Sequence, residues 1–119
     1  MKESTLASEI APSQFAALAH ETRLIVFRTV MNAGPEGVSA GDLAVKAQVT
    51  PSNLSAHLTV LVSAGLLDVR RDGRRRYYFA ALPAVRGLLN FLIMECCDGN
   101  PDVCDLQVSE LTGLHKEAC

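Results

Sequence analysis

The sequence contains no tryptophan, and aromatic residues make up only 5% of its 119 positions. It also lacks any apolar run as long as the roughly 18 residues that a membrane-crossing helix needs. No apolar core follows the early acidic residue, so no signal peptide is visible. We therefore expect a cytoplasmic protein with no membrane partner. Its core should consist of Leu, Val and Ala, because 49% of the residues are hydrophobic.

Positive charge is not in excess, because 11 Lys and Arg stand against 13 Asp and Glu and give a net charge of −2. This balance excludes a generally basic coat for nucleic acid but not a local basic patch. Residues 70–76 carry five of the basic side chains: Arg70, Arg71, Arg74, Arg75 and Arg76. A chain of this length forms one small domain, and a partner subunit would help to bury its core.

The first third of the chain shows helical spacing of apolar residues. Residues 1–11 are polar with scattered apolar positions, and we expect them to be flexible. Pro12 suits the first position of a helix. A second helix is predicted over residues 21–32, because its apolar residues give it a broad apolar face. Gly34-Pro35 ends it. These two helices indicate a mainly α fold.

Two further helices should be joined by only about three residues. Ser39 is a good N-cap for the first of them, and Asp42 forms an imperfect capping box with it. Thr50-Pro51 opens the second helix, and Gly65 stops it. The apolar face of this second helix comprises Leu54, Leu58 and Leu61. The pattern predicts a helix-turn-helix.

The following segment predicts a β-hairpin. Residues 66–70 and 76–80 are short apolar or aromatic runs, and Asp72-Gly73 between them is a strong turn signal. A helix-turn-helix followed by a hairpin is a winged helix. Pro83 then opens a last helix that is more apolar than a small monomer needs, so we expect it to pack against a second copy. The predicted domain covers residues 12–97.

Small polar side chains form the outward face of the helix that starts at Thr50-Pro51. With the leucines turned toward the core, that face and its flanks comprise Ser52, Asn53, Ser55, Ala56 and Thr59. Such a face can approach the major groove of DNA closely and can hydrogen-bond base edges. The alternative is an ordinary solvated face. We expect His57, beside the apolar face, to be packed or to contact phosphate rather than to bind a ligand.

The arginine-rich hairpin is the second predicted DNA contact. Guanidinium groups suit phosphate oxygens and the minor groove. The residues expected to make these contacts are Arg71, Arg74, Arg75 and Arg76. A charged edge strand that discourages aggregation is the alternative reading.

The sequence resembles the ArsR family of winged-helix metalloregulators, specifically its arsenical-resistance repressors. The resemblance spans about residues 15–97. It rests on these stretches: His20-Glu21-Thr22-Arg23-Leu24, Ala33-Gly34-Pro35-Glu36-Gly37, Ser52-Asn53-Leu54-Ser55-Ala56-His57-Leu58, Leu61 with Ala64-Gly65-Leu66-Leu67, Arg71-Asp72-Gly73-Arg74 and Glu95-Cys96-Cys97. It implies a homodimer paired through the first and last helices. Such a dimer represses transcription by binding double-stranded operator DNA, and a ligand releases it.

Two of the family's ligand sites have no match here. Ser39 and Gly41 stand at the positions of a Cys-x-Cys pair, and residues 83–97 contain no His for a zinc site. The resemblance implies a third arrangement, in which a vicinal Cys pair ends the last helix and a further Cys follows in the tail of residues 98–119. The matching residues are Cys96, Cys97 and Cys104.

Three thiolates suit trivalent arsenic or antimony, which are soft centres, so arsenite or antimonite is the expected inducer. Cadmium or lead could use the same thiols, and so could an oxidation-sensing repressor. Zinc with Cys119 or His115 as a further ligand fits poorly, since a vicinal pair is not a typical zinc spacing. Cys96 could also be a small buried apolar residue. An enzyme is not expected, because the pair follows a helix C-terminus among carboxylates, where thiolates are disfavoured.

Overall fold

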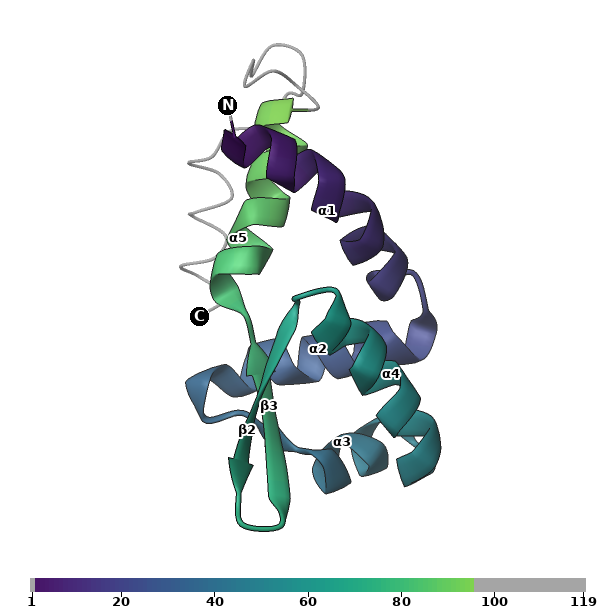
Figure 1. Cartoon of the computed structure of the whole chain (residues 1–119). Coiled ribbons are helices and arrows are strands. Elements are labelled where there is room, and N and C mark those ends of the chain that lie inside the picture. The colour runs from purple at the N-terminus through teal and green to yellow at the C-terminus, as the bar shows by residue number, and fades with distance from the viewer. Residues whose placement is uncertain (1, 96–119) are drawn as a thin grey trace.

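The computed structural model describes residues 2–95, and it describes side chains from Glu9 to Ile93. The elements in chain order are α1 (Lys2–Leu18), α2 (Glu21–Ala33), the 3-10 turn η1 (Gly34–Glu36), β1 (Val38–Ser39), α3 (Ala40–Ala47), α4 (Pro51–Ser63), β2 (Leu67–Asp72), β3 (Arg75–Ala80), α5 (Leu82–Asn90) and the π-helical turn η2 (Phe91–Glu95). In Figure 1, α1 and α5 form the upper part of the molecule. The lower part contains α2, α3, α4 and the hairpin. The predicted winged helix-turn-helix is confirmed.

Local side-chain caps define the helix-turn-helix. The Ser39 hydroxyl accepts a hydrogen bond from the Asp42 N–H at 3.2 Å and caps α3. The Thr50 hydroxyl accepts one from the Asn53 N–H at 3.2 Å and caps α4. Between the two helices Gln48 adopts a left-handed conformation with φ 57°, and Gly65 does so after α4 with φ 80°. The predicted starts and the predicted stop of these helices are confirmed.

The hairpin belongs to a three-stranded antiparallel sheet with β3 in the centre and the order β1-β3-β2. The predicted turn at Asp72-Gly73 was one residue early, because Asp72 pairs with Arg75 and leaves Gly73 and Arg74 as the loop. Gly73 has φ 65°, which glycine adopts without strain. The sequence did not predict β1, whose two residues are too few to show a periodic pattern.

The first helix is longer than the sequence suggested. We expected it to begin at Pro12 after a flexible segment, but α1 begins at Lys2 and Pro12 lies inside it. A proline inside a helix removes one backbone hydrogen bond. Packing offsets that loss, because Ala11 and Ala17 are buried in the core, and α1 contacts α2, α4, α5 and η2.

Most of the core is built from aliphatic side chains of the lower part of the molecule. Its largest fully buried members are Val26, Val30, Leu43, Leu54, Leu61, Leu66 and Leu67. They come from α2, α3, α4, the start of β2 and the residue just before it, so the core holds the helix-turn-helix and the hairpin as one unit. The expected core of Leu, Val and Ala is confirmed.

The last helix also differs from its predicted form. A single helix was expected over residues 83–97, but α5 ends at Asn90 and the chain continues as the π-helical turn η2. The predicted inducer ligands Cys96, Cys97 and Cys104 lie outside the described residues. Among the helices that the structure describes, none has the length and apolar character to cross a bilayer.

Candidate nucleic-acid interface

The outward face of α4 has the composition that the sequence predicted. Leu54, Leu58 and Leu61 are buried. The exposed residues of the helix include Ser52, Asn53, Ser55, Ala56 and Thr59. All five predicted base-contacting residues are therefore open to solvent along one helix.

Some of these exposed side chains already have hydrogen-bond partners in or next to α4, and others do not. The Thr59 hydroxyl donates to the Ser55 carbonyl at 2.9 Å, and the Ser52 and Thr50 hydroxyls lie 3.5 Å apart. The side-chain amide of Asn53 has no hydrogen-bond partner within the described part of the chain. Its NH2 group and its carbonyl oxygen are thus available for a base edge. An amide can donate one hydrogen bond and accept another from the same base.

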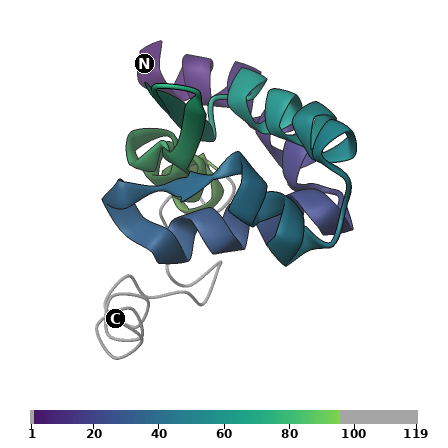
Figure 2. The same ribbon diagram turned by 90° about the horizontal axis from the view of Figure 1, so that it is seen from below.

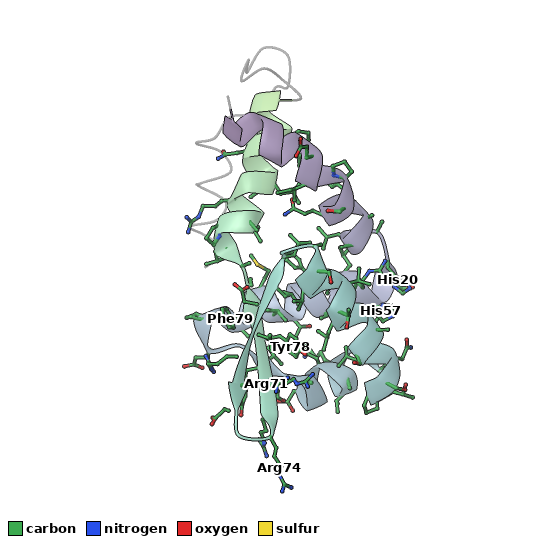
Figure 3. All side chains as sticks on the ribbon, in the orientation of Figure 1. His20, His57, Arg71, Arg74, Tyr78 and Phe79 are labelled. Atoms are coloured by element: carbon green, nitrogen blue, oxygen red, sulfur yellow. The ribbon has the colours of Figure 1, made fainter. Side chains whose placement is uncertain are left out.

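His57 faces the body of the protein rather than the outward face of α4. Its ring lies 4.5 Å from the His20 ring, measured between centroids, and its Nδ1 lies 3.3 Å from the Arg23 guanidinium. Figure 3 shows His20 and His57 side by side between the start of α2 and α4. Burial lowers the pKa of His57, and the nearby His20 and Arg23 lower it further. The structure therefore favours the packed role over the phosphate contact.

No local pattern in the sequence points to the contacts that His20 and Arg23 make with His57. Arg23 and His57 are 34 positions apart, so their contact depends on tertiary structure. His20 was part of the stretches that carry the family resemblance but had no assigned role. In the structure it caps α2, because its Nδ1 accepts a hydrogen bond from the Thr22 N–H at 3.1 Å.

The hairpin arginines differ in their contacts. Arg70 has partners within the protein, whereas the other four form a free set without partners among the described residues. Arg70 donates to the Glu36 carbonyl at 3.1 Å and lies 5.4 Å from the centroid of the Tyr77 ring. The free set comprises the four predicted DNA contacts, Arg71, Arg74, Arg75 and Arg76, which are all exposed. Among the described residues no carboxylate pairs with any of the four. Figure 3 shows Arg74 at the tip of the hairpin.

Of the hollows that border the hairpin in the described part of the chain, two are lined by more than one of its arginines. One, of about 190 Å³, lies between α4 and the hairpin and is lined by Leu58, Thr59, Val62, Ser63, Val69, Arg71, Arg76 and Tyr78. The other, of about 580 Å³, lies between the start of α3 and the hairpin tip and is lined by Ser39, Ala40, Gly41, Asp42, Arg74, Arg75 and Arg76. Figure 2 views the molecule from this end, where α3, α4 and the hairpin lie together.

The described residues do not offer a metal site at this end of the molecule. Ser39 caps α3 and Gly41 has no side chain, so the positions of the family's Cys-x-Cys pair supply no thiolate. Within the described residues no group of three or more His, Cys, Asp or Glu side chains could hold a metal ion. The exposed face of α4 and the four hairpin arginines without carboxylate partners among the described residues suit contact with an anionic polymer instead.

Comparison with known sequences supports this conclusion. A family model described as a helix-turn-helix domain matches residues 18–70. YceK, an uncharacterised HTH-type transcriptional regulator of Bacillus subtilis (strain 168), is 35% identical over 77 residues, which are 65% of this chain and 74% of YceK. A probable mercury resistance operon repressor of Streptomyces lividans is 28% identical over 122 residues, covering 85% of this chain and 95% of the repressor.

Solved structures show the same fold. A possible transcriptional regulator for arsenical resistance matches with a TM-score of 0.60 and 30% identity, covering 67% of this chain and 80% of that chain. The homodimeric winged helix-turn-helix domain of Mb0332 from Mycobacterium bovis, a possible ArsR-family regulator, matches with a TM-score of 0.61 and 23% identity. That match covers 76% of this chain and 82% of the domain.

The winged helix, its exposed small-residue helix and the four arginines that have no carboxylate partner among the described residues are the features of a DNA-binding protein. The chain belongs to the winged helix-turn-helix transcriptional regulators, and ArsR-family proteins are among its structural neighbours. Its relatives are regulators of transcription rather than enzymes.

Proposed function

We propose that this regulator is a repressor that binds operator DNA as a homodimer and leaves it when arsenite or antimonite binds Cys96, Cys97 and Cys104. The observation that carries this proposal is the position of the vicinal pair. Cys96 follows directly on Glu95, the last residue of η2, and η2 contacts α1. A ligand on the pair would therefore act at the end of the two helices that are expected to form the dimer.

The DNA-binding part of the proposal rests on two complementary surfaces. The exposed face of α4 offers close approach and the free Asn53 amide, which suit base edges. The hairpin offers four arginines without carboxylate partners among the described residues, which suit phosphates. The first surface would supply sequence preference, and the second would supply affinity that depends on salt.

The homodimer part rests on apolar surface that one copy leaves open. Ile10 and Phe15 of α1 and Leu82 and Leu89 of α5 are exposed. Between the two helices lies a mainly apolar hollow of about 150 Å³, lined by Ile10, Gln14, Ala84, Gly87, Leu88 and Phe91. A second copy of the chain would cover this surface, and exposed apolar area of this kind is typical of association sites. The homodimeric Mb0332 domain has the same fold.

The inducer part rests on the chemistry of the donor set. Three thiols can satisfy a trivalent arsenic or antimony centre, and soft thiolates select soft centres over hard ones. Similarity to a possible regulator for arsenical resistance agrees with this choice. Similarity to a probable mercury resistance operon repressor favours mercuric ion as a second candidate, because it is also thiophilic.

The experiment is release of the protein from DNA by a panel of inducers. The probe is a labelled duplex that the wild-type protein has selected from random-sequence DNA. Arsenite and antimonite should release the protein at lower concentrations than cadmium, lead, zinc, mercuric ion or hydrogen peroxide. Release by mercuric ion alone would show that the inducer is mercuric ion and not arsenite. Release by peroxide that is at least as effective as release by arsenite would show that the protein senses oxidation.

A further inference from the structure

Arg23 joins three helices through one side chain. It lies in α2, and its Nε donates to the Ala17 carbonyl in the last turn of α1 at 2.6 Å. A second guanidinium nitrogen lies 3.5 Å from the Ala16 carbonyl. The third nitrogen lies 3.3 Å from His57 Nδ1 on α4. One cation thus contacts two carbonyls in the last turn of α1 and one residue of α4.

The chemistry of these contacts fixes the proton on His57. A guanidinium group has only donors, so His57 Nδ1 must be the acceptor and the ring proton must sit on Nε2. His20 Nδ1 is likewise an acceptor, because it receives the Thr22 N–H. The arrangement therefore requires neutral His57 beside the Arg23 cation, with the His20 ring 4.5 Å away.

We propose that Arg23 is a positioning residue for DNA recognition, which holds α4 against the last turn of α1 through neutral His57. Protonation of His57 would put a second cation against Arg23 and remove the only acceptor that α4 offers it. The contact would then open, and α4 would lose this restraint on its position relative to the last turn of α1. This inference rests on the DNA-binding part of the proposed function and not on the inducer.

The surroundings of His57 support this role. The charged or titratable groups that act on it are His20 and Arg23, at the start of α2. The last turn of α1 contributes backbone carbonyls to the group, and the described parts of α3 and β2 contribute no charged contact to His57. No carboxylate is therefore in place to stabilise an imidazolium, and burial disfavours it further.

The same group connects the DNA-reading helix to the upper part of the molecule. α1 contacts α5 and η2, and its last turn is held by Arg23. A displacement of α1 along its axis would therefore reach α4 through this guanidinium group as well as through the direct packing of the two helices. The contact between Arg23 and His57 can be made or broken. Coupling between distant sites requires an element of this kind, with two distinct arrangements.

The first arm of the test uses matched arginine variants of α2. Arg23→Met keeps much of the apolar stem and removes all donors, whereas Arg28→Met removes an exposed arginine without a partner among the described residues. We expect Arg23→Met to weaken binding to the selected duplex by about fivefold or more, the lower end of typical coupling, and Arg28→Met to leave it nearly unchanged. Equal affinities for both variants would overturn the proposal.

The second arm measures the pH profile of DNA binding without inducer. Lowering the pH from about 7.5 to about 5.5 should weaken binding of the wild type, and His57→Gln should flatten this dependence. A histidine that contacts phosphate predicts the reverse, because its protonation would tighten binding. Tighter wild-type binding at low pH that His57→Gln abolishes would therefore overturn the proposal. This arm decides the question even if Arg23→Met does not fold, and it is independent of arsenite.

Discussion

Arg71 and Arg76 stand directly opposite each other on the two antiparallel strands of the hairpin. Both border the hollow beside α4, together with the hydroxyl-bearing residues Thr59 and Ser63. Like charges at directly opposed positions destabilise a sheet. No carboxylate among the described residues offsets them. This pair therefore destabilises the protein when no DNA is bound. It suits an anion that binds between the hairpin and α4.

Replacing one member of this pair should separate stability from function. Arg71→Gln removes the repulsion, so we expect the free energy of unfolding to rise by about 0.2–1 kcal/mol. DNA affinity should fall at the same time. Urea unfolding and fluorescence anisotropy with the selected duplex measure the two quantities. A variant that is less stable and binds DNA as well as the wild type would show that the pair has a structural role.

The hairpin tip should contribute affinity without sequence preference. Replacing both Arg74 and Arg75 with Ala should weaken binding to selected and scrambled duplexes alike. Loss of about two phosphate contacts should reduce the slope of log affinity against log salt by about 1–2. Arg86→Ala is the control, since Arg86 is exposed on α5, which lies in the upper part of the molecule away from the hairpin tip (Figure 1). Unchanged affinity at both low and high salt would rule out the tip as a DNA contact.

Asn53 should contribute sequence preference. Its side-chain amide is exposed and has no partner within the described residues, so Asn53→Ala should lose one base contact worth about 1–3 kcal/mol of discrimination. Binding to scrambled DNA should change little. Asn32→Ala, at the exposed end of α2, is the matched control. Reselection of DNA by the Asn53 variant measures the outcome, and an unchanged preferred sequence would exclude a base contact.

Local signals predicted much of the DNA-reading end from sequence. Thr50-Pro51 and Ser39 fix helix starts through hydrogen bonds to residues three positions away, and Gly65 fixes a stop through its own backbone conformation. Such features depend on neighbours in the chain, so a sequence displays them. The outward face of α4 follows from helical spacing once the buried leucines are identified.

The errors fall where tertiary packing decides. Pro12 marks a helix start by local preference, but the packing of Ala11 and Ala17 extends α1 through it. The strand β1 exists because Val38 and Ser39 pair with β3, about 40 residues later in the sequence. The contact between Arg23 and His57 also depends on the fold, so the sequence left open whether His57 is packed or contacts phosphate, and the structure favours the packed role.

Acid should weaken the folded state through His57. Its surroundings lower its pKa from the ordinary value of 6.5, so the unfolded chain binds this proton more readily than the folded chain. By linkage, the stability associated with neutral His57 is present above about pH 6.5 and is lost as the pH falls toward and through the folded-state pKa. Urea unfolding at several pH values should show a steeper acid loss for the wild type than for His57→Gln. Parallel curves would contradict this assignment.

The most direct measurement of the central claim is arsenite titration of the complex between protein and selected DNA, for the wild type and for Cys96→Ser, Cys97→Ser, Cys104→Ser and Cys119→Ser. All five proteins should bind the DNA equally well without arsenite. Arsenite should release the wild type and Cys119→Ser, whereas Cys96→Ser and Cys97→Ser should stay bound, and Cys104→Ser should need more arsenite. Normal release of Cys96→Ser and Cys97→Ser would contradict the account, because the vicinal pair would then not be the inducer site.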